Sequence, residues 1–519
     1  MTTNMTSEAS VDQGRLSRCF WIVLLLCTVV GGGLRLYQIN GASLWIDEVW
    51  SVRDALELHT MRPTRGPGYL PMTLVLRAAG FKYPDIRIDD VGSWREAGLD
   101  LWHIRLGPAI LGILSIPVLG WSVRRAWGTK VAIAFVLLLC FAPWHIYWSQ
   151  LGRYYTLKFI LLGLSLSLYF YGTRQQRPGS VGIGIALAYA AFLVHPPSIL
   201  IGLVFAADLA VSWLRKDPIR LGKTGWVVGV LVPVAAFATM KVESLFVGMN
   251  MDKFVGSSPD LGQSGPLVLA NAVYMLGLPL VVFASAVWWT LIRSQEARMR
   301  QTGWYLFFAA AVPIVVFTVF GFLGKFTHVR YTFECLLGVL LLASFGLAYL
   351  YEALAKTRGI LIAASPALVL IASMALALAS YYSQGHHNHR RWVDAFALVE
   401  SLRKDGERVV APRHEVGQYY LGDNSIRKPP GVLHRFDMYA EGETLWIVDT
   451  GTTAVKTRRP IYADHADLVE SFPIQVWQPF TELRVYRYTP RPEEVWRAEK
   501  AEMDAASQVN KQTDLQDNP

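Results

Sequence analysis

Residues 19–48 read CFWIVLLLCTVVGGGLRLYQINGASLWIDE, an apolar run followed by a short polar stretch that ends on Asp47 and Glu48. The apolar part, residues 19–37, contains a single charged side chain, Arg35. A bilayer core about 30 Å thick needs about 20 mostly apolar residues in one helix. The stretch therefore predicts a membrane-spanning helix that leads directly into an acidic segment at the membrane surface.

The rest of the 519-residue chain has the same apolar character. Hydrophobic residues make up 53% and the mean hydropathy is +0.30, a composition that excludes a disordered chain. Charged residues make up 17%, against roughly 25% in an ordinary soluble domain. Because the apolar residues form long blocks rather than periodic stripes, the composition also argues against a soluble multi-domain enzyme.

Long apolar blocks predict an α-helical polytopic membrane protein with about eleven transmembrane helices. The blocks are residues 19–37, 101–123, 131–148, 154–171, 181–194, 196–214, 225–240, 266–292, 304–323, 331–350 and 359–382. We interpret the first block as a retained helix rather than a cleaved signal peptide, because no small-residue cleavage site follows it. Residues 1–382 are therefore expected to form one transmembrane domain.

Lysine and arginine are unevenly distributed among the connections between these blocks. Alternate connections are basic, for example the one with Arg124, Arg125 and Lys130, and the opposite ones contain few cations. Cytoplasmic loops carry the excess of Lys and Arg in membrane proteins. We therefore expect a plasma (inner) membrane protein with a cytoplasmic N-terminus and an exterior C-terminal part. The formal net charge of +9 then needs no nucleic-acid partner, since the inner loops account for much of it.

Two long segments on the expected outer side interrupt this alternation. Residues 38–100 are too many for a simple connection and contain candidate amphipathic helices at 48–58 and 69–79. Residues 383–489 have the pattern of a small α/β domain. Its expected helices are 391–402, 415–420 and 463–471, and its expected strands are 408–411, 445–449 and 483–488. The polar tail, residues 490–519, is expected to be disordered.

The candidate chemistry lies on the expected outer side. Asp47 and Glu48, beside aromatic residues at the membrane surface, suit general-base catalysis, and a solvated pair of interface carboxylates is the alternative interpretation. Several cations lie on the same side although topology does not require them there: Arg105, Arg153, Lys325 and Arg330. Together they would bind an anionic group such as a lipid phosphate, unless each merely snorkels to the interface.

His195 precedes Pro196 and Pro197 at an expected outer helix junction. Two prolines cannot continue a helix, so His195 either satisfies the freed backbone groups or contacts a ligand. The four cysteines all lie in or beside apolar blocks, which disfavours a disulfide framework or a zinc site. The sequence contains no phosphate-loop, dinucleotide or zinc-protease motif. We expect no required cofactor, and an activated substrate that is already in the membrane.

Several stretches resemble the motifs of a known enzyme family. Residues 34–36 (LRL) and 44–48 (LWIDE) are similar to the first-loop motif of the GT-C membrane glycosyltransferases. The most similar branch is glycosyltransferase family 39, the protein O-mannosyltransferase and aminoarabinose-transferase-like group. Residues 148–155 (WSQLGRYY) resemble its second motif, usually Ser-Gln-Glu-Ala-Arg-x-Tyr, and residues 330–331 (RY) resemble the pair that opens a late span. The resemblance covers roughly residues 15–382.

The resemblance implies a reaction at the outer face of the membrane. A sugar carried on a polyprenyl phosphate is transferred to an acceptor hydroxyl on a glycan, lipid or protein, and a single displacement inverts the anomeric centre. Asp47 is then the general base, and Glu48 supports it or orients the acceptor. The implied ligands of the donor phosphate are Arg153, Lys325, Arg330 and Arg105. The implied substrate contacts are Tyr154, Tyr331, Tyr69 and His195.

The chain departs from the family pattern at two places. After the acidic pair, where His-Pro-Pro-Leu-Tyr is frequent, residues 65–69 read RGPGY, so Arg65 becomes a further candidate for contact with the phosphate. Leu151 and Gly152 replace the Glu-Ala that is common in the second motif. Some members of the family bind a divalent metal near the acidic pair, and both alternatives stay open for this chain.

Two other functions are compatible with a polytopic chain. A transporter of a lipid-linked or small anionic substrate predicts inverted repeats and ionisable residues near mid-membrane. Such residues are scarce in the apolar blocks, with Asp208 as an exception. A multi-span anchor for an exterior binding module would leave the cations on the side of Asp47 unexplained. The transporter is therefore the main alternative to a glycosyltransferase.

Overall fold

The computed structural model describes residues 3–57, 66–82, 85–87, 89–215, 264–325, 327–383, 391–411, 413–426, 444–450, 466–472 and 483–488, with Ala498 and Ala501. The chain forms two compact units. The helical unit comprises Met1–Ile39, Ser51–Gly80 and Trp102–Gln384, and the α/β unit comprises Asn40–Trp50, Phe81–Leu101 and Gly385–Pro519. The acidic segment with Asp47 and Glu48 thus belongs to the same unit as the C-terminal part of the chain.

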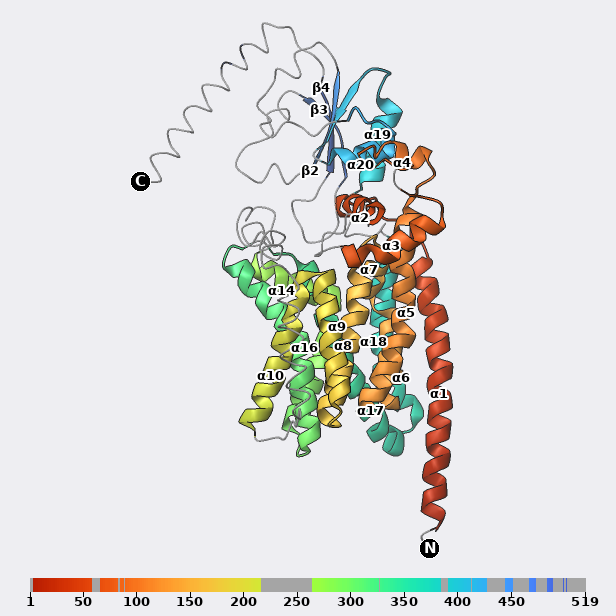
Figure 1. Ribbon diagram of the computed structural model, residues 1–519, viewed down its shortest axis with the longest axis vertical. Helices are drawn as coiled ribbons and strands as arrows, with labels where there is room; N and C mark the ends of the chain where they lie inside the picture. The colour runs from red at the N-terminus through yellow and green to blue at the C-terminus, as the bar shows by residue number, and fades with distance from the viewer. Residues whose placement is uncertain are drawn as a thin grey trace, which may run out of the picture. The chain divides into compact units, whose positions relative to one another are not determined.

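The helical unit is built from long apolar helices (Figure 1). Its helices are α1 (Thr3–Leu36), α3 (Gly66–Ala78), α5 (Leu101–Trp127), α6 (Thr129–Phe141), α7 (Pro143–Ser149), α8 (Tyr155–Arg174), α9 (Pro178–Val194), α10 (Leu200–Leu214), α14 (Gly265–Leu276), α15 (Leu278–Arg293), α16 (Ala297–Phe322), α17 (Cys335–Arg358) and α18 (Ile360–Ser383). The short 3₁₀ helices η2 (Pro196–Ile199) and η3 (Val329–Thr332) lie between longer ones. The helix α2 (Ile46–Leu56) begins in the α/β unit and ends in the helical unit.

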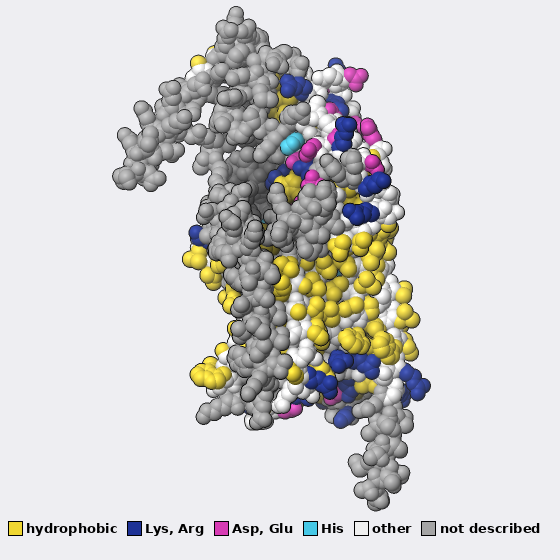
Figure 2. Space-filling model, viewed as in Figure 1, with side chains coloured by type: hydrophobic (Ala, Val, Ile, Leu, Met, Phe, Trp, Pro, Cys, Tyr) yellow, Lys and Arg dark blue, Asp and Glu magenta, His cyan; other side chains and the backbone are white. Residues whose placement is uncertain are grey.

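Within the described residues, 7 helices are long and apolar enough to cross a membrane, and two bent helix pairs bring the number to at most 9. Hydrophobic side chains form a broad band over these helices, and Lys and Arg side chains lie beyond its edges (Figure 2). The expected span at residues 225–240 lies outside the described residues. A polytopic α-helical membrane domain is therefore confirmed.

Two of the expected continuous spans are each broken into two helices. The pair α6 and α7 is bent by 59°, directly before Pro143, which cannot donate a backbone hydrogen bond. The pair α14 and α15 is bent by 94° at Gly277, whose φ of 85° lies in the left-handed region. The sequence-based spans 131–148 and 266–292 were wrong on this point, because their apolar runs continue across both breaks.

Helix α17 is the centre of the bundle and packs against α6, α15, α16 and α18. Gly338 lies where α17 crosses α16, and a Cβ atom there would lie 2.4 Å from the backbone nitrogen of Ala310. Small residues at crossings let helix backbones approach closely, which is how helices gain contact energy in lipid. Helices α8 and α9 also approach closely at small residues. Ser165 Oγ of α8 donates a 2.6 Å hydrogen bond to the carbonyl oxygen of Gly184 in α9.

A buried arginine closes the break between α6 and α7. Arg35, near the end of α1, is fully buried and donates hydrogen bonds to the carbonyl oxygens of Leu139 (3.1 Å) and Cys140 (3.4 Å) in the last turn of α6. The last carbonyls of a helix have no partner within it. Arg35 therefore caps α6, and its side chain also contacts His145 Nδ1 of α7 at 2.9 Å.

Gln150 provides the reciprocal cap, at the end of α1. Its Nε2 donates to the carbonyl oxygens of Leu34 (3.3 Å), Arg35 (3.2 Å) and Tyr37 (2.7 Å). Its Oε1 accepts a 2.9 Å hydrogen bond from the hydroxyl of Tyr381 in α18. Two residues from the motif stretches thus hold α1, the broken span and α18 together.

The α/β unit contains a mixed four-stranded sheet in the order β1-β2-β4-β3. Its elements are α4 (Ser93–Glu96), α19 (Trp392–Leu402), β1 (Arg408–Val410), α20 (His414–Leu421), β2 (Leu445–Thr450), β3 (Ala466–Phe472) and β4 (Leu483–Tyr488). Strand β1 pairs parallel with β2, and β4 pairs antiparallel with both β2 and β3. The predicted small α/β unit is confirmed, as are its helices at 391–402 and 415–420.

One element of this unit was predicted wrongly. Residues 463–471 were expected to be helical, but 466–472 form strand β3 at the edge of the sheet. The register along β4, from Ala466 opposite Tyr488 to Phe472 opposite Leu483, supplies backbone hydrogen bonds that the local sequence does not reveal. Pairing with a neighbouring strand therefore outweighs local propensity here.

Glu407 joins the sheet to the end of α19. Its carboxylate accepts hydrogen bonds from Trp446 Nε1 (2.7 Å) and Arg487 Nη2 (3.2 Å), and from the backbone N–H of Lys404 (3.0 Å). Desolvation by burial would raise the pKa of Glu407, but these hydrogen bonds outweigh it and hold that pKa below its ordinary value. The carboxylate is therefore kept in its ionised form.

The reciprocal caps predict a measurable loss of stability in Gln150→Ala. The substitution leaves the carbonyl groups of Arg35 and Tyr37 without this side-chain donor, whereas that of Leu34 keeps the hydroxyl of Tyr382. We expect the free energy of unfolding to fall by about 1–3 kcal/mol. Denaturation of the purified full-length protein in detergent measures it. Tyr381→Phe, which removes the hydrogen bond to Gln150 Oε1 and keeps the caps of α1, is the matched control and should cost less. Equal stability of the two variants would contradict this assignment.

Candidate active site

The acidic pair lies in the first turn of α2, where one carboxylate has a structural task. Glu48 Oε2 accepts a 3.0 Å hydrogen bond from the backbone N–H of Trp45, the residue before the helix. This is one half of a capping box, in which the third helical residue reaches back to the capping position. Asp47, the second residue of the helix, lies at the end where the helix dipole favours negative charge. The two adjacent carboxylates therefore have different roles.

Arg153 is held by hydroxyl groups from three elements of the helical unit. Its Nη1 donates to Ser51 Oγ in α2 (2.7 Å) and to the hydroxyl of Tyr69 in α3 (3.1 Å). Its Nη2 donates to the hydroxyl of Tyr154 (3.3 Å), and the guanidinium lies 4.7 Å from the centre of the Tyr154 ring. Ser51 follows Asp47 by four residues, so both point from the same face of α2. Ser51 was not among the predicted site residues.

A small pocket opens beside this arginine. It is lined by Gly68, Tyr69, Pro71, Met72, Pro108, Leu111, Arg153 and Tyr154, which come from α3, α5 and the start of α8. Its lining thus combines one cation and two phenol groups with apolar side chains.

A row of aromatic rings leads from Arg153 to Arg330. The ring of His195 lies 5.1 Å from that of Tyr154 and 5.8 Å from that of Tyr331. Arg330 Nη2 donates to the hydroxyl of Tyr331 at 3.4 Å, and its guanidinium lies 5.2 Å from the ring centre. With Tyr69, which contacts Arg153, the structure thus brings together six of the predicted residues, and these come from four separate stretches of the sequence.

A buried ionic network lies behind this row. Lys158 Nζ lies 3.1 Å from Glu334 Oε1 and 3.3 Å from His195 Nδ1, and Ser198 Oγ donates to Glu334 Oε1 at 3.1 Å. Lysine can only donate, so His195 Nδ1 accepts here. Sequence reasoning missed Lys158 and Glu334 as partners. A signal was present, because opposite charges inside two apolar blocks are expensive in a membrane unless they are paired.

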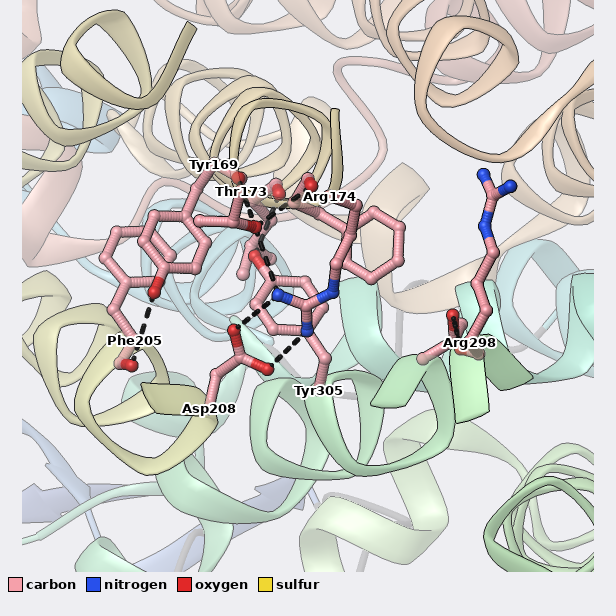
Figure 3. A network of polar contacts seen from close by, with 10 residues as sticks. Tyr169, Thr173, Arg174, Phe205, Asp208, Arg298 and Tyr305 are labelled. Atoms are coloured by element: carbon pink, nitrogen blue, oxygen red, sulfur yellow. Dashed lines mark hydrogen bonds and ion pairs between the residues drawn. The ribbon is translucent and has the colours of Figure 1, made fainter. Parts of the chain in front are cut away.

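A second buried ion pair lies at the other end of α8. Arg174 binds Asp208 of α10 through both nitrogens, with Nη2–Oδ1 2.7 Å and Nη1–Oδ2 3.2 Å (Figure 3). The Tyr169 ring stacks on Phe205 at 3.9 Å beside this pair. Asp208, the apparent mid-membrane charge, is therefore paired with a residue at a helix end. That placement does not resemble the substrate site expected of a transporter.

The two other predicted cations that the structure describes, Arg105 and Lys325, have different surroundings. Arg105 is fully buried and donates a 2.9 Å hydrogen bond to the carbonyl oxygen of Ile39. Lys325 follows α16 and is half-buried. Arg65 lies outside the described residues. The structure thus places Arg105 at a backbone contact that links the end of α1 to α5.

The fit of a divalent metal can be tested against the side chains present. Among the described residues, no three His, Cys, Asp or Glu side chains lie close enough together to hold a metal ion. A protein site for such a metal ordinarily offers several of these ligands. The described residues therefore do not form a site of this kind.

Both ion pairs of α8 predict a characteristic stability pattern. Lys158→Met leaves the buried carboxylate of Glu334 without its cation, and we expect the free energy of unfolding to fall by about 3–5 kcal/mol. Adding Glu334→Gln should restore much of that loss, because no buried charge then stays unpaired. Arg174→Met, with and without Asp208→Asn, should behave in the same way. Denaturation of the full-length protein measures these four variants and the single variants Glu334→Gln and Asp208→Asn, and additive losses would contradict the pairing.

Comparison with known proteins identifies the architecture. No protein-family model and no curated protein matches the sequence. The apo structure of ArnT from Cupriavidus metallidurans is similar with a TM-score of 0.55 at 14% identity, over 92% of this chain and 100% of that chain. AglB, the oligosaccharyltransferase of Archaeoglobus fulgidus, in complex with an inhibitory peptide and a dolichol-phosphate, has a TM-score of 0.53 at 13% identity, over 90% and 74%. The Archaeoglobus fulgidus oligosaccharyltransferase complex with Zn and sulfate has a TM-score of 0.51 at 13% identity, over 82% and 68%.

These identities are low, so the similarity concerns the fold. It extends over most of the chain and includes both units. The predicted fold class is confirmed: the chain has the fold of the GT-C membrane glycosyltransferases.

Proposed function

We propose that this protein is an integral membrane glycosyltransferase that moves a sugar from a polyprenyl-phosphate donor to an acceptor hydroxyl. The observation that carries the proposal is Arg153, fixed by three hydroxyl groups beside a pocket with apolar walls, in a chain with the GT-C fold. An arginine in such a place suits the phosphate of a lipid-linked sugar. The AglB structure, which holds a dolichol-phosphate, supports a donor of this class.

The proposed reaction is a single displacement at the anomeric carbon. The acceptor oxygen forms a bond to that carbon while Asp47 takes the hydroxyl proton. The bond from the anomeric carbon to the phosphate oxygen breaks, and its electron pair leaves with the polyprenyl phosphate. Attack from the face opposite the leaving group inverts the configuration. Glu48, which caps α2, supports Asp47 by fixing the helix that carries it.

The negative charge that grows on the departing phosphate needs fixed donors. Arg153 supplies them in this proposal, and Arg330 adds a second guanidinium at the other end of the aromatic row. Preorganised donors of this kind are usually the largest single contribution to catalysis. The other proposed phosphate ligands are Lys325, Arg105 and Arg65. Tyr69, Tyr154, Tyr331 and His195 are the proposed contacts to the rest of the donor.

The proposed location is the plasma (inner) membrane, with the N-terminus in the cytoplasm and the α/β unit outside. Support comes from the charges at one end of the bundle. Arg124 and Arg125 end α5, and Lys130 at the start of α6 forms an ion pair with Glu352 near the end of α17. Basic residues gathered at one side of a membrane domain mark its cytoplasmic face. The acceptor, a glycan, lipid or protein, then binds from the exterior.

The base assignment predicts that Asp47→Asn abolishes transfer. The amide keeps the size of the side chain but cannot accept the acceptor proton, and we expect kcat to fall by about 100-fold or more. Transfer from a labelled polyprenyl-phosphate sugar, in membranes with and without each variant, measures it. Glu48→Gln is the matched control, because glutamine in that position also caps the helix, and it should cost far less. Full activity of Asp47→Asn would refute the base.

The phosphate assignment predicts that Arg153→Lys is a poor replacement. Lysine keeps the charge but lacks the planar fork that reaches Ser51, Tyr69 and Tyr154 together. We expect kcat/KM for the lipid-linked donor to fall by about tenfold or more. Arg124→Lys, at the opposite end of the bundle where Arg124 donates to Ser17 Oγ, is the control and should leave kcat/KM unchanged. Similar kinetics of both variants would contradict a phosphate contact at Arg153.

A further inference from the structure

The three residues before α2 are each held by a different hydrogen bond within the α/β unit. Ser43 Oγ accepts from the backbone N–H of Val393 at 3.2 Å, in the first turn of α19. The backbone N–H of Leu44 donates to the hydroxyl of Tyr420 at 2.7 Å. The backbone N–H of Trp45 donates to Glu48 at 3.0 Å. The segment that leads into Asp47 is therefore fixed at three successive positions.

Two of these contacts come from the opposite end of the chain. Leu44 and Tyr420 are separated by 376 positions, and Ser43 and Val393 by 350. Leu44 is fully buried, and a buried backbone N–H without a partner is costly. The hydroxyl of Tyr420 meets that requirement. No motif in the sequence marks Tyr420, because its contact depends on the tertiary fold alone.

Tyr420 is itself held firmly within the unit. Its ring stacks on that of Phe396 in α19, with ring centres 6.2 Å apart and planes inclined by 21°. Its carbonyl oxygen accepts a 2.9 Å hydrogen bond from Arg95 Nη1 in α4. These two contacts fix the position of the Tyr420 hydroxyl oxygen. A rigid acceptor at this point fixes the backbone only three residues before Asp47.

We propose that Tyr420 is a positioning residue for the transfer reaction and that the C-terminal part of the α/β unit serves to orient Asp47. The inference rests on the proposed function, in which Asp47 takes the proton of the acceptor. Small errors in the placement of a catalytic group can cost large factors in rate. The donor phosphate is bound by Arg153 in the helical unit, so a displaced Asp47 segment lowers kcat and leaves the KM for the donor unchanged.

The test compares Tyr420→Phe with Tyr419→Phe in the full-length protein in lipid nanodiscs. Tyr420→Phe removes the acceptor of the Leu44 N–H and keeps the aromatic ring. Tyr419→Phe is the matched control on the neighbouring residue, whose hydroxyl donates to the carbonyl oxygen of Leu99 at 3.5 Å. We expect kcat to fall by about tenfold in Tyr420→Phe, the scale of one hydrogen bond to a buried group, and to change by less than about twofold in Tyr419→Phe.

Hydrogen exchange of the peptide that contains Leu44 provides a readout independent of activity. The backbone N–H of Leu44 should exchange faster in Tyr420→Phe and at the wild-type rate in Tyr419→Phe. Wild-type kcat and exchange in Tyr420→Phe, or an equal fall of kcat in both variants, would overturn the proposal. A rise in the donor KM without a change in kcat would also overturn it. Full activity of Asp47→Asn would instead overturn the proposed function, and the exchange rates would still report whether Tyr420 holds the segment.

Discussion

The helical unit depends on the exchange of caps between Arg35 and Gln150. Arg35, at the end of α1, supplies donors to the last carbonyls of α6, and Gln150, after α7, supplies donors to the last carbonyls of α1. In the apolar interior, a helix end without partners costs several kcal/mol per exposed group. The break before Pro143 is therefore stable because Arg35, which belongs to another helix, donates hydrogen bonds to the carbonyl groups that the break leaves without partners.

The two residues of this exchange precede the two proposed reactive groups in the sequence. Arg35 and Gln150 have structural contacts, whereas Asp47, twelve residues after Arg35, and Arg153, three residues after Gln150, are the proposed reactive groups. Fixing the end of α7 fixes where the next residues of the chain begin. Arg153 follows Gln150 by only three residues, so its backbone continues from a residue whose side chain is held at the end of α1. In this stretch, a structural contact therefore lies directly before the proposed phosphate ligand.

The sequence predicted those features that depend on local composition. The apolar blocks predicted the long helices, and runs of β-branched and aromatic residues predicted strands such as β2 and β4. It failed where tertiary contacts decide. Strand β3 at the edge of its sheet and the pairing of Lys158 with Glu334 depend on neighbours distant in sequence. The bends before Pro143 and at Gly277 were missed for another reason, because the apolar runs continue across both breaks. In the candidate site, charged and aromatic residue types could be recognised, but Ser51 and Tyr420 carry no sequence signal.

The contacts of Ser43 and Leu44 have a consequence for how the site forms. Their partners Val393 and Tyr420 are synthesised more than 300 positions later, after all the described helices of the bundle. Contacts of such high sequence separation form late, because the entropy of closing the chain must be overcome first. The acidic segment is therefore expected to gain its final conformation only after the C-terminal part has folded. The proposed base would then be placed last, after the helices that carry the proposed phosphate ligands.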